Sequence, residues 1–492
     1  MLMGFLGHNG FACGTQEHPV LLDPILLPRY GEEYTSSPVE IYPPRKIRID
    51  GLPDPAAVVI SHEHSDHFHL PSLNKLSRAT PVIVGPLMID SVTEHIEELG
   101  FTVQRAQFGE DIEVGSTVIT LYPPHPETVL WESRVSQVYV RDAADPDVAG
   151  IYLSIDALVS EEFLADIDNG RVPPPAVLAL SNNAQITPPG VFGSLDNLKS
   201  SELSEGSGQL TAFAGLDIGH QLLVQYADAP QLRDCHFLVC GGGFLKDYEE
   251  MGPFPFSEQR ELAECLSLLV RNVDVYGPEP GELMECGPDG IRIVGELGWL
   301  RVDASRFAEL KERRAQFLRE NGRISLRPIR IPLDTDNENT DINAVEAGLD
   351  YLSRGILVSD LGRRLVGAGR EQTNLGTHRL IIKLLTHHAP ARSYAWNVRT
   401  GIFDQIPDVP LEDALTEFPF GLVTHASDLA AVFTGELQIW DVVGIAMRSW
   451  YTGNSTDSLV ALMFNLYGEQ IRPDISCRVY TKQLQIISEG VE

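Results

Sequence analysis

The sequence predicts a layered α/β fold that is followed by an α+β domain. Short apolar runs alternate with helical patterns in the first part of the chain, and Gly, Pro and Asp mark the turns between them. Residues 56–60 form a buried-strand pattern, and residues 89–99 then carry apolar side chains at helical spacing before Gly100. Strands that alternate with helices form sheets covered by helices, so we expect a layered architecture.

The length of the chain indicates more than one domain. Its 492 residues exceed what one hydrophobic core usually supports, and 43% hydrophobic with 22% charged residues is ordinary globular composition. We expect a first domain at residues 1–300, a charged linker helix at 301–322 and a C-terminal α+β domain at 323–492. In the last domain, residues 428–440 are either ordinary amphipathic packing or, by a faint resemblance, a sterol-carrier-like segment that helps to bind a substrate. The Gly- and Ser-rich residues 193–208 predict a long loop, either an insertion or an active-site lid.

The chain is strongly acidic. It has 69 Asp and Glu against 37 Lys and Arg, and its net charge of −32 repels nucleic-acid backbones and anionic lipid surfaces. The apolar start has no basic residues, no apolar run reaches the ~18 residues that cross a bilayer, and the six cysteines form no Cys-x-x-Cys pair. We therefore expect a cytoplasmic protein that acts on a small-molecule substrate, without a nucleic-acid partner, a membrane span or a disulfide framework. The sequence leaves its oligomeric state open.

One short segment carries most of the side chains that can bind a metal. Residues 61–67 are Ser-His-Glu-His-Ser-Asp-His, directly after the predicted strand. His62 and His64 stand two apart at the end of that strand, where alternate side chains share a face and can bind one ion together. Asp66 and His67 follow where the chain should turn, diverge from that pair and can hold a second ion about 3.5–4 Å away. The segment therefore predicts a centre of two divalent metal ions.

The pattern His-x-His-x-Asp-His resembles the signature of the metallo-β-lactamase superfamily. Residues 6–10 and 21–24 are similar to the opening strands of its lactonase, phospholipase D and sugar-nucleotide hydroxylase branches. The resemblance covers roughly residues 4–290. It implies a metallo-β-lactamase-type αββα sandwich with a dinuclear metal site, which makes residues 1–300 a catalytic domain.

The resemblance also implies further metal ligands. His125, after a hairpin strand, matches the family's third ligand of the first ion, and Asp156, at the end of the next major strand, matches the carboxylate that bridges both ions. The family's last ligand is a histidine that this chain lacks at the matching place, where Glu279 stands instead. Either Glu279 replaces that histidine, or the ligand is absent, or His220 or His236 takes its role.

The leading hypothesis from these residues is hydrolysis. Two ions, in the first instance zinc, lower the pKa of a bridging water, and the resulting hydroxide attacks an ester, lactone, amide or phosphodiester. Asp66 then acts as the catalytic residue that both binds a metal and orients this hydroxide.

Two other hypotheses follow from the missing histidine. An oxygen ligand at Glu279 makes the second site harder, which suits iron or manganese and favours a dinuclear-iron oxygenase on the same fold. The chain has no Cys/His set for an iron–sulfur donor, so such an oxygenase needs an external reductase. The third hypothesis is a binding protein with a decayed site, and the intact residues 62–67 argue against it.

Overall fold

The computed structural model describes most of the chain. The described residues are 1–30, 39–182, 216–245, 247–248, 252–253, 258–270, 273–321, 337–371, 377–442, 447–450, 459–468 and 473–490. The predicted loop at 193–208 lies outside these residues, and so do residues 322–336, at the start of the predicted C-terminal domain.

The first sheet has eight strands and includes the strand that precedes the histidine segment. In order across the sheet these are β21 (Gly290–Glu296), β20 (Glu282–Gly287), β1 (Leu2–Gly7), β2 (Gly10–Gly14), β3 (Pro19–Leu22), β7 (Ala57–Ile60), β8 (Val82–Val84) and β9 (Val103–Arg105). The strands from β3 to β9 run parallel to one another. All four residues of β7 are buried because both faces of this inner strand are covered, which explains its continuous apolar run.

The second sheet has seven strands and packs face to face on the first. Its order is β10 (Asp111–Val114), β11 (Thr117–Tyr122), β12 (Gln137–Asp142), β13 (Ile151–Leu153), β14 (Val177–Ser181), β15 (His236–Cys240) and β19 (Val275–Tyr276). The inner faces of the two sheets share one hydrophobic core, in which Val59 of β7 meets Leu121 of β11 and Leu238 of β15.

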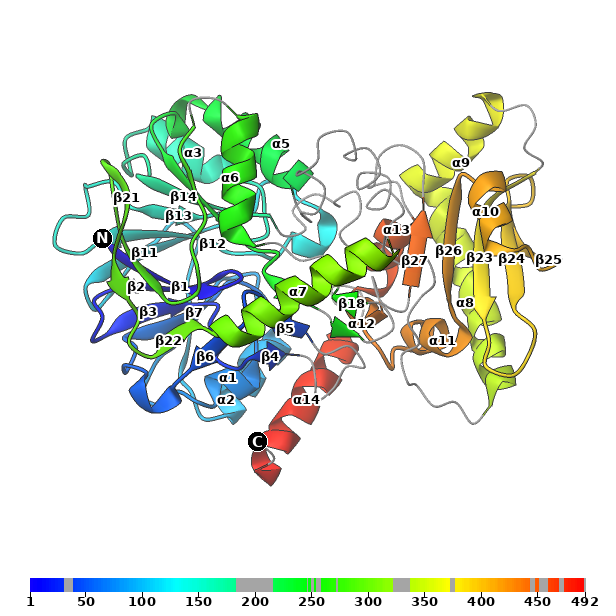
Figure 1. Ribbon diagram of the computed structural model, residues 1–492, viewed down its shortest axis with the longest axis horizontal. Coiled ribbons are helices and arrows are strands. Elements are labelled where there is room, and N and C mark those ends of the chain that lie inside the picture. Colours follow the sequence, from blue (N-terminus) through cyan, green and yellow to red (C-terminus); the bar gives the residue numbers. More distant parts are fainter. Residues whose placement is uncertain are drawn as a thin grey trace.

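Helices cover the outer face of each sheet. The first sheet carries α1 (Leu70–Leu73) and α2 (Asp90–Glu98), and the second carries α3 (Glu161–Asp168), α5 (Leu216–Ala227) and α6 (Gln259–Leu269). The helix predicted from residues 89–99 is α2. The four layers form the αββα sandwich that the sequence predicted (Figure 1).

Shorter elements connect these layers. A three-stranded sheet consists of β16 (Phe244–Leu245), β5 (Val39–Ile41) and β4 (Arg29–Tyr30). Two strand pairs are β17 (Asp247–Tyr248) with β18 (Gly252–Pro253), and β22 (Leu300–Val302) with β6 (Arg45–Ile47). The described 3-10 helices are η1 (Ile49–Gly51), η2 (Leu130–Glu132) and η4 (Pro230–Leu232). Of these, η2 bears on the site because it stands in the connection between β11 and β12.

A long helix leads from the sandwich to a second group of strands and helices. This helix, α7 (Ala304–Asn321), is the charged helix expected at 301–322. A five-stranded sheet follows, in the order β25 (Ile402–Ile406), β24 (Arg392–Asn397), β23 (His378–Leu385), β26 (Phe420–His425) and β27 (Met447–Trp450). One face packs with α8 (Glu338–Val358), α9 (Asp360–Glu371), α11 (Ala426–Thr434), α12 (Ile439–Val442) and α13 (Leu459–Tyr467), and the other with α10 (Leu411–Glu417). The domain boundaries stay a prediction.

Two of the C-terminal helices place apolar side chains in the core. Residues 428–440 span α11 and α12, and Leu429, Val432 and Ile439 are buried in the core of this sheet. Among the described residues, no helix is both long enough and apolar enough to cross a membrane.

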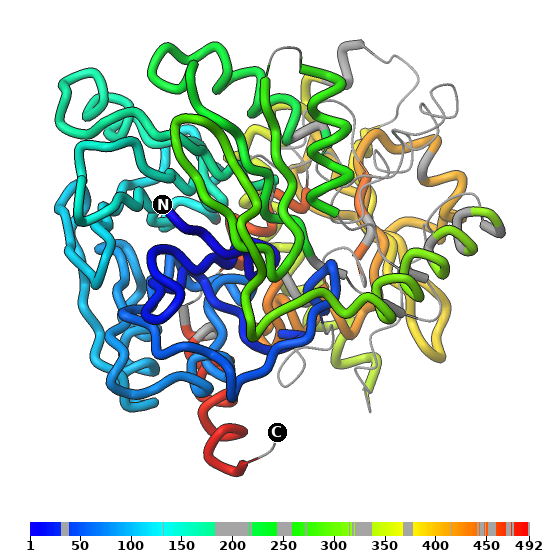
Figure 2. The backbone as a smooth tube through the Cα atoms, turned by 60° about the vertical axis from the view of Figure 1, so that its left-hand side comes forward, coloured from blue at the N-terminus to red at the C-terminus, as the bar shows by residue number. Residues whose placement is uncertain are grey.

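The last helix returns to the sandwich. This helix, α14 (Pro473–Glu489), packs beside α1 and α2, and Figure 2 shows it in red below the blue N-terminal strands. The buried hydroxyl of Tyr480 donates a hydrogen bond to the carbonyl of Glu63 at 2.9 Å, across 417 positions of sequence. The side-chain oxygen of Gln483 accepts the backbone N–H of Leu70 at 3.3 Å. The helix thus holds the backbone of the histidine segment from outside the sandwich.

Removing the Tyr480 hydroxyl should loosen this attachment. In Tyr480→Phe the carbonyl of Glu63 loses a buried donor, and we expect the free energy of unfolding to fall by about 1–3 kcal/mol. Denaturant unfolding of the metal-free protein measures this loss. The matched control is Tyr351→Phe, which alters an exposed side chain and should leave the stability unchanged. Equal stability of the two variants would contradict the role of Tyr480.

Candidate metal centre

The histidine segment leaves the sheet immediately after β7. The strand ends at Ile60, so His62 and His64 lie in the following loop, just beyond the strand end at which the sequence analysis placed them. The chain turns at once, because the carbonyl of His64 accepts the N–H groups of His67 at 2.9 Å and of Phe68 at 2.7 Å. This turn brings the ring of His67 to 4.2 Å from that of His62, centroid to centroid. All three imidazoles are buried.

Two histidines and a glutamate form the first group of convergent side chains. His62, His64 and Glu132 each offer one ligand atom, and these atoms lie within 4.8 Å of one another. Oε2 of Glu132, the last residue of η2, is 3.4 Å from Nε2 of His62 and 3.3 Å from Nδ1 of His64. Metal–ligand bonds of about 2.0–2.2 Å place neighbouring ligand atoms about 3.0–3.5 Å apart. The group therefore has the dimensions of one coordination sphere.

The environment of Glu132 shows that this group fits a cation. Its side chain is 1% exposed, and neither its Oε2 nor Nε2 of His62 has a hydrogen-bond partner among the described residues. Burial raises the pKa of Glu132 to about 7, because the charged carboxylate loses its hydration. A buried carboxylate that faces two imidazole nitrogens is stabilised when a divalent ion binds between them.

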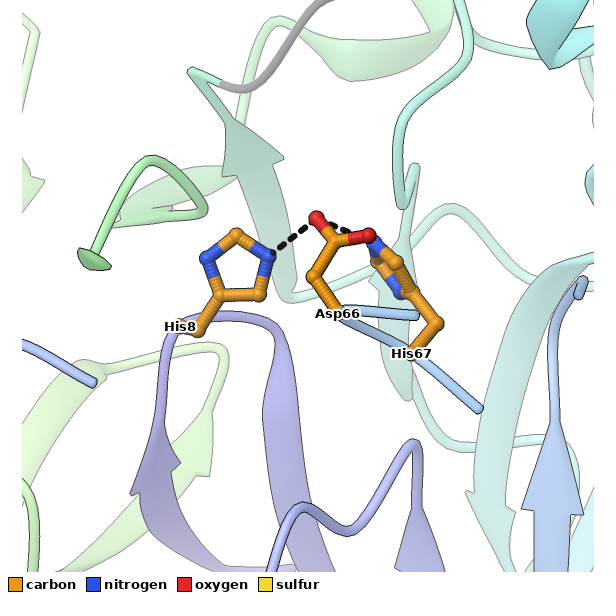
Figure 3. Close-up of side chains that lie close together, drawn as sticks. All are labelled: His8, Asp66 and His67. Carbon is orange, nitrogen blue, oxygen red and sulfur yellow. Dashed lines mark hydrogen bonds and ion pairs between the residues drawn. The ribbon is translucent and has the colours of Figure 1, made fainter. Parts of the chain in front are cut away.

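A second group lies beside the first and contains the other half of the predicted motif. His8, Asp66 and His67 offer ligand atoms within 4.8 Å of one another. Figure 3 shows the carboxylate of Asp66 between the two imidazole rings. Its Oδ2 is 2.9 Å from Nε2 of His8 and 3.5 Å from Nε2 of His67. Asp66 is 17% exposed, whereas both histidines are buried, so this group has one side nearer to solvent.

Asp156 lies between the two groups. Its Oδ2 is 3.1 Å from Nε2 of His67, and it forms a third convergent group with His62 and His67. Its other oxygen accepts hydrogen bonds from the side chains of Asn9 at 2.8 Å and Ser181 at 3.0 Å. The protein thus holds one oxygen of this carboxylate and leaves the other directed at the histidines.

A carboxylate outside these groups sets the proton positions of two histidines. Oδ2 of Asp23 accepts hydrogen bonds from Nδ1 of His67 at 2.7 Å and from the hydroxyl of Ser61 at 2.6 Å. Because the Ser61 hydroxyl donates to Asp23, it accepts the hydrogen bond from Nδ1 of His62 at 2.9 Å. Both imidazoles therefore carry a proton on Nδ1 and direct Nε2 at the convergent groups.

The charges of the cluster shift histidine pKa values in opposite directions. Burial and the neighbouring imidazoles hold the pKa of His62 well below its ordinary value. Burial also opposes a charge on His67, but the carboxylates of Asp156 and Asp66 outweigh it and hold the pKa of His67 well above its ordinary value. A metal that binds Nε2 of His67 would compete with a proton for this nitrogen, so metal binding at this group should depend on pH.

The structure brings most of the predicted ligands together. The convergent groups include His62, His64, Asp66, His67 and Asp156. His125 is not among them, because its Nε2 pairs with the exposed Glu161 at 3.2 Å. The first group contains Glu132 where the resemblance had suggested His125.

The residues considered for the last ligand also lie outside the convergent groups. Glu279 pairs with Arg260 at 3.6 Å. His236 pairs with Asp274 at 3.3 Å, and His220 lies on α5. Among the described residues, none of these three belongs to a convergent group.

Two members of the groups were not predicted. Glu132 stands in a connection without any recognisable pattern, and only the folded chain brings it to His62. His8 did carry a signal, because Gly7-His8-Asn9-Gly10 is a turn sequence between two apolar strands and histidine is unusual there. The resemblance of this segment to an opening strand does not by itself predict a ligand.

A comparison with known families agrees with this geometry. Residues 18–132 match the model of a family described as beta-lactamase superfamily domain. This part of the chain is similar to a beta-lactamase superfamily domain, and the four-layer sandwich agrees with that similarity. The match includes His62 to His67 and ends at Glu132, so it spans the first convergent group. No curated protein matches the chain.

Three solved structures are each similar to more than half of the chain. A possible metal-dependent hydrolase from Veillonella parvula has 16% identity and a TM-score of 0.37, and the match covers 57% of this chain and 98% of that one. An isothiocyanate hydrolase from Delia radicum gut bacteria has 11% identity and a TM-score of 0.37, over 58% and 100%. CmlA, a diiron beta-hydroxylase from Streptomyces venezuelae, has 14% identity and a TM-score of 0.34, over 57% and 53%.

The position of Asp23 leads to a prediction about metal affinity. In Asp23→Asn an amide N–H₂ can face Nδ1 of His67, which drives the imidazole proton to Nε2 and removes the lone pair that a metal needs. Asn tolerates the left-handed backbone of residue 23, whose φ is 42°, so the fold should persist. We expect metal affinity to fall about 10–100-fold, as measured by competition with a chromogenic chelator.

The control for this experiment is Asp54→Asn, which makes the same change at an exposed position. It should bind metal like the wild type. An Asp23→Asn protein that folds and keeps wild-type affinity would show that Asp23 does not set the tautomer.

Proposed function

We propose that this protein is a dinuclear-iron oxygenase that hydroxylates a small organic molecule. The observation that carries the proposal is the first convergent group, in which one carboxylate, Glu132, joins two imidazoles, His62 and His64. Two histidines and one carboxylate are the ligand set typical of non-haem iron(II) in oxygenases. Some zinc hydrolases use the same set, so the preference for iron also depends on the further carboxylates of the centre.

The other two groups also contain carboxylates. The second group adds the carboxylate of Asp66 to His67. Asp156 lies between the groups, with Oδ1 bound by Asn9 and Ser181 and Oδ2 at 3.1 Å from Nε2 of His67. Three carboxylates in one buried cluster are hard ligands, which suit iron or manganese. The oxygen ligand that favours iron is therefore Glu132 in the first group, and not Glu279, which the sequence suggested for the second.

Each residue of the centre has a proposed role. His62, His64 and Glu132 would hold the first ion, Asp66 and His67 the second, and Asp156 would bridge. Bound iron would supply the electrons that cleave O₂. The balanced reaction takes one O₂, one C–H bond, two electrons and two protons, and it yields a C–OH group and water. The electrons need an external reductase, since the sequence has no Cys/His set for an iron–sulfur donor.

Substrate would approach from the side of Asp66. Among the three carboxylates of the centre, Asp66 is 17% exposed, whereas Glu132 and Asp156 are each 1% exposed. The buried side excludes water from the remaining ligands and protects them from exchange with solvent. The net charge of −32 disfavours polyanionic substrates and supports a small molecule without a high negative charge.

Hydrolysis is the second candidate, and the exposure of Asp66 favours it. A carboxylate that reaches both the metal groups and solvent can bind a metal and orient a water for attack on an ester, lactone, amide or phosphodiester. Zinc would serve this reaction, and neither O₂ nor a reductant would be consumed. The two candidates therefore differ in metal content and in their need for oxygen.

Replacement of the Glu132 carboxylate by an imidazole tests the proposal. Protein from iron- and zinc-supplemented medium should contain iron, and it should consume O₂ when a reductant and substrate are present. Glu132→His should lower the iron content at least about tenfold and raise the zinc content, because nitrogen replaces a hard oxygen ligand. Elemental analysis and an oxygen electrode measure both effects.

The control variant is Glu127→His, which makes the same change at an exposed position near η2 and should keep wild-type metal content. Zinc as the resident metal in the wild type, together with substrate turnover under anaerobic conditions, would overturn the oxygenase and favour the hydrolase.

A further inference from the structure

The turn between β1 and β2 brings a histidine to the metal centre in a strained conformation. β1 ends at Gly7 and β2 begins at Gly10, so His8 and Asn9 form the turn. The φ of His8 is 54°, in the left-handed region that Gly and Asn adopt far more readily. A bulky residue keeps such a backbone when the position of its side chain matters.

The surrounding backbone holds this turn in place. The N–H of Gly241 donates to the carbonyl of His8 at 3.0 Å. A Cβ at Gly243 would lie 3.3 Å from Cα of His8, so the glycine permits a close approach of the two segments. His8 itself is 1% exposed. Its ring therefore has a defined position.

Two imidazoles converge on the same oxygen of one carboxylate. Oδ2 of Asp66 lies 2.9 Å from Nε2 of His8 and 3.5 Å from Nε2 of His67. The rings of the two histidines stand edge to face, with centroids 5.4 Å apart. Ligand atoms on adjacent positions around one ion, with bonds of about 2.0–2.2 Å, have separations of this size.

We propose that His8 is a ligand of the second metal ion, together with Asp66 and His67. This inference rests on the two-ion part of the proposed function and is independent of the reaction that follows. It gives the second group two imidazoles and a carboxylate, the same donor set as the first group. The adjacent Asn9 holds Asp156 at 2.8 Å, so the turn serves both groups.

The alternative role for His8 is to orient Asp66 by a hydrogen bond, and two variants separate the roles. His8→Gln keeps an amide N–H that can donate to Asp66 but removes the imidazole. His8→Asn suits the left-handed backbone and is too short for either role. A ligand role predicts that both variants lose the second ion, whereas an orienting role predicts that only His8→Asn does.

The experiment uses chelator-stripped full-length protein that is reloaded with cobalt(II). Titration followed by visible absorption gives the affinity for each ion, and proton NMR counts the strongly shifted, exchangeable imidazole N–H signals of metal-bound histidines. We expect His8→Gln and His8→Asn to weaken binding of the second cobalt at least about 100-fold. The first cobalt should bind as in the wild type, and one shifted N–H signal should disappear.

The control is His18→Gln, which replaces an exposed histidine in the connection between β2 and β3. It should bind two cobalt ions with an unchanged spectrum. Two ions in His8→Gln, with affinity within threefold of wild type and all shifted signals present, would overturn the ligand role and leave the proposed function intact. Fewer than two ions in the wild type would overturn both proposals.

Discussion

The metal centre depends on one carboxylate that belongs to none of the convergent groups. Asp23, directly after β3, accepts hydrogen bonds from Nδ1 of His67 and from both the hydroxyl and the N–H of Ser61. Through Ser61 it also determines the proton position on His62. One buried side chain therefore fixes the tautomers of two histidines that belong to different groups. Without Asp23, the imidazole proton of His67 or of His62 could move to Nε2. That nitrogen could then no longer bind a metal ion beside the neighbouring carboxylates.

This constraint explains how a cluster of three carboxylates can be buried. Asp156 and Glu132 are each 1% exposed, and unpaired charges of one sign would be costly at such a site. The imidazoles lie between the carboxylates: His67 contacts Asp156 and Asp66, and His62 contacts Glu132. The carboxylates of Asp156 and Asp66 in turn raise the pKa of His67, which favours its positively charged form against burial. Divalent ions would compensate more of the negative charge, so metal binding and folding stability are coupled at this site.

The sequence was sufficient for the parts of the centre that are local. His62 to His67 come from one segment after a buried strand, and their convergence follows from a single turn of the backbone. Local sequence could not decide whether His125 or Glu132 joins His62 and His64 in the first group. Both residues stand in the same connection, and the side that faces inward depends on how η2 packs against α13, which comes from the C-terminal part of the chain. His8 required knowledge that the turn between β1 and β2 reaches the second sheet, where Gly241 binds its carbonyl.

The C-terminal elements are therefore structural parts of the metal centre. α13 packs against η2, which carries Glu132, and α14 binds the backbone of Glu63 through Tyr480. The segment around Glu63 and the helix η2 supply the ligands of the first convergent group. They follow strands of different sheets of the sandwich. A histidine segment without α14 would keep its ligands but lose the support that fixes their distance from Glu132. Because a dinuclear site tolerates only small displacements of its ligands, the affinity for the first ion reports whether the whole chain has folded.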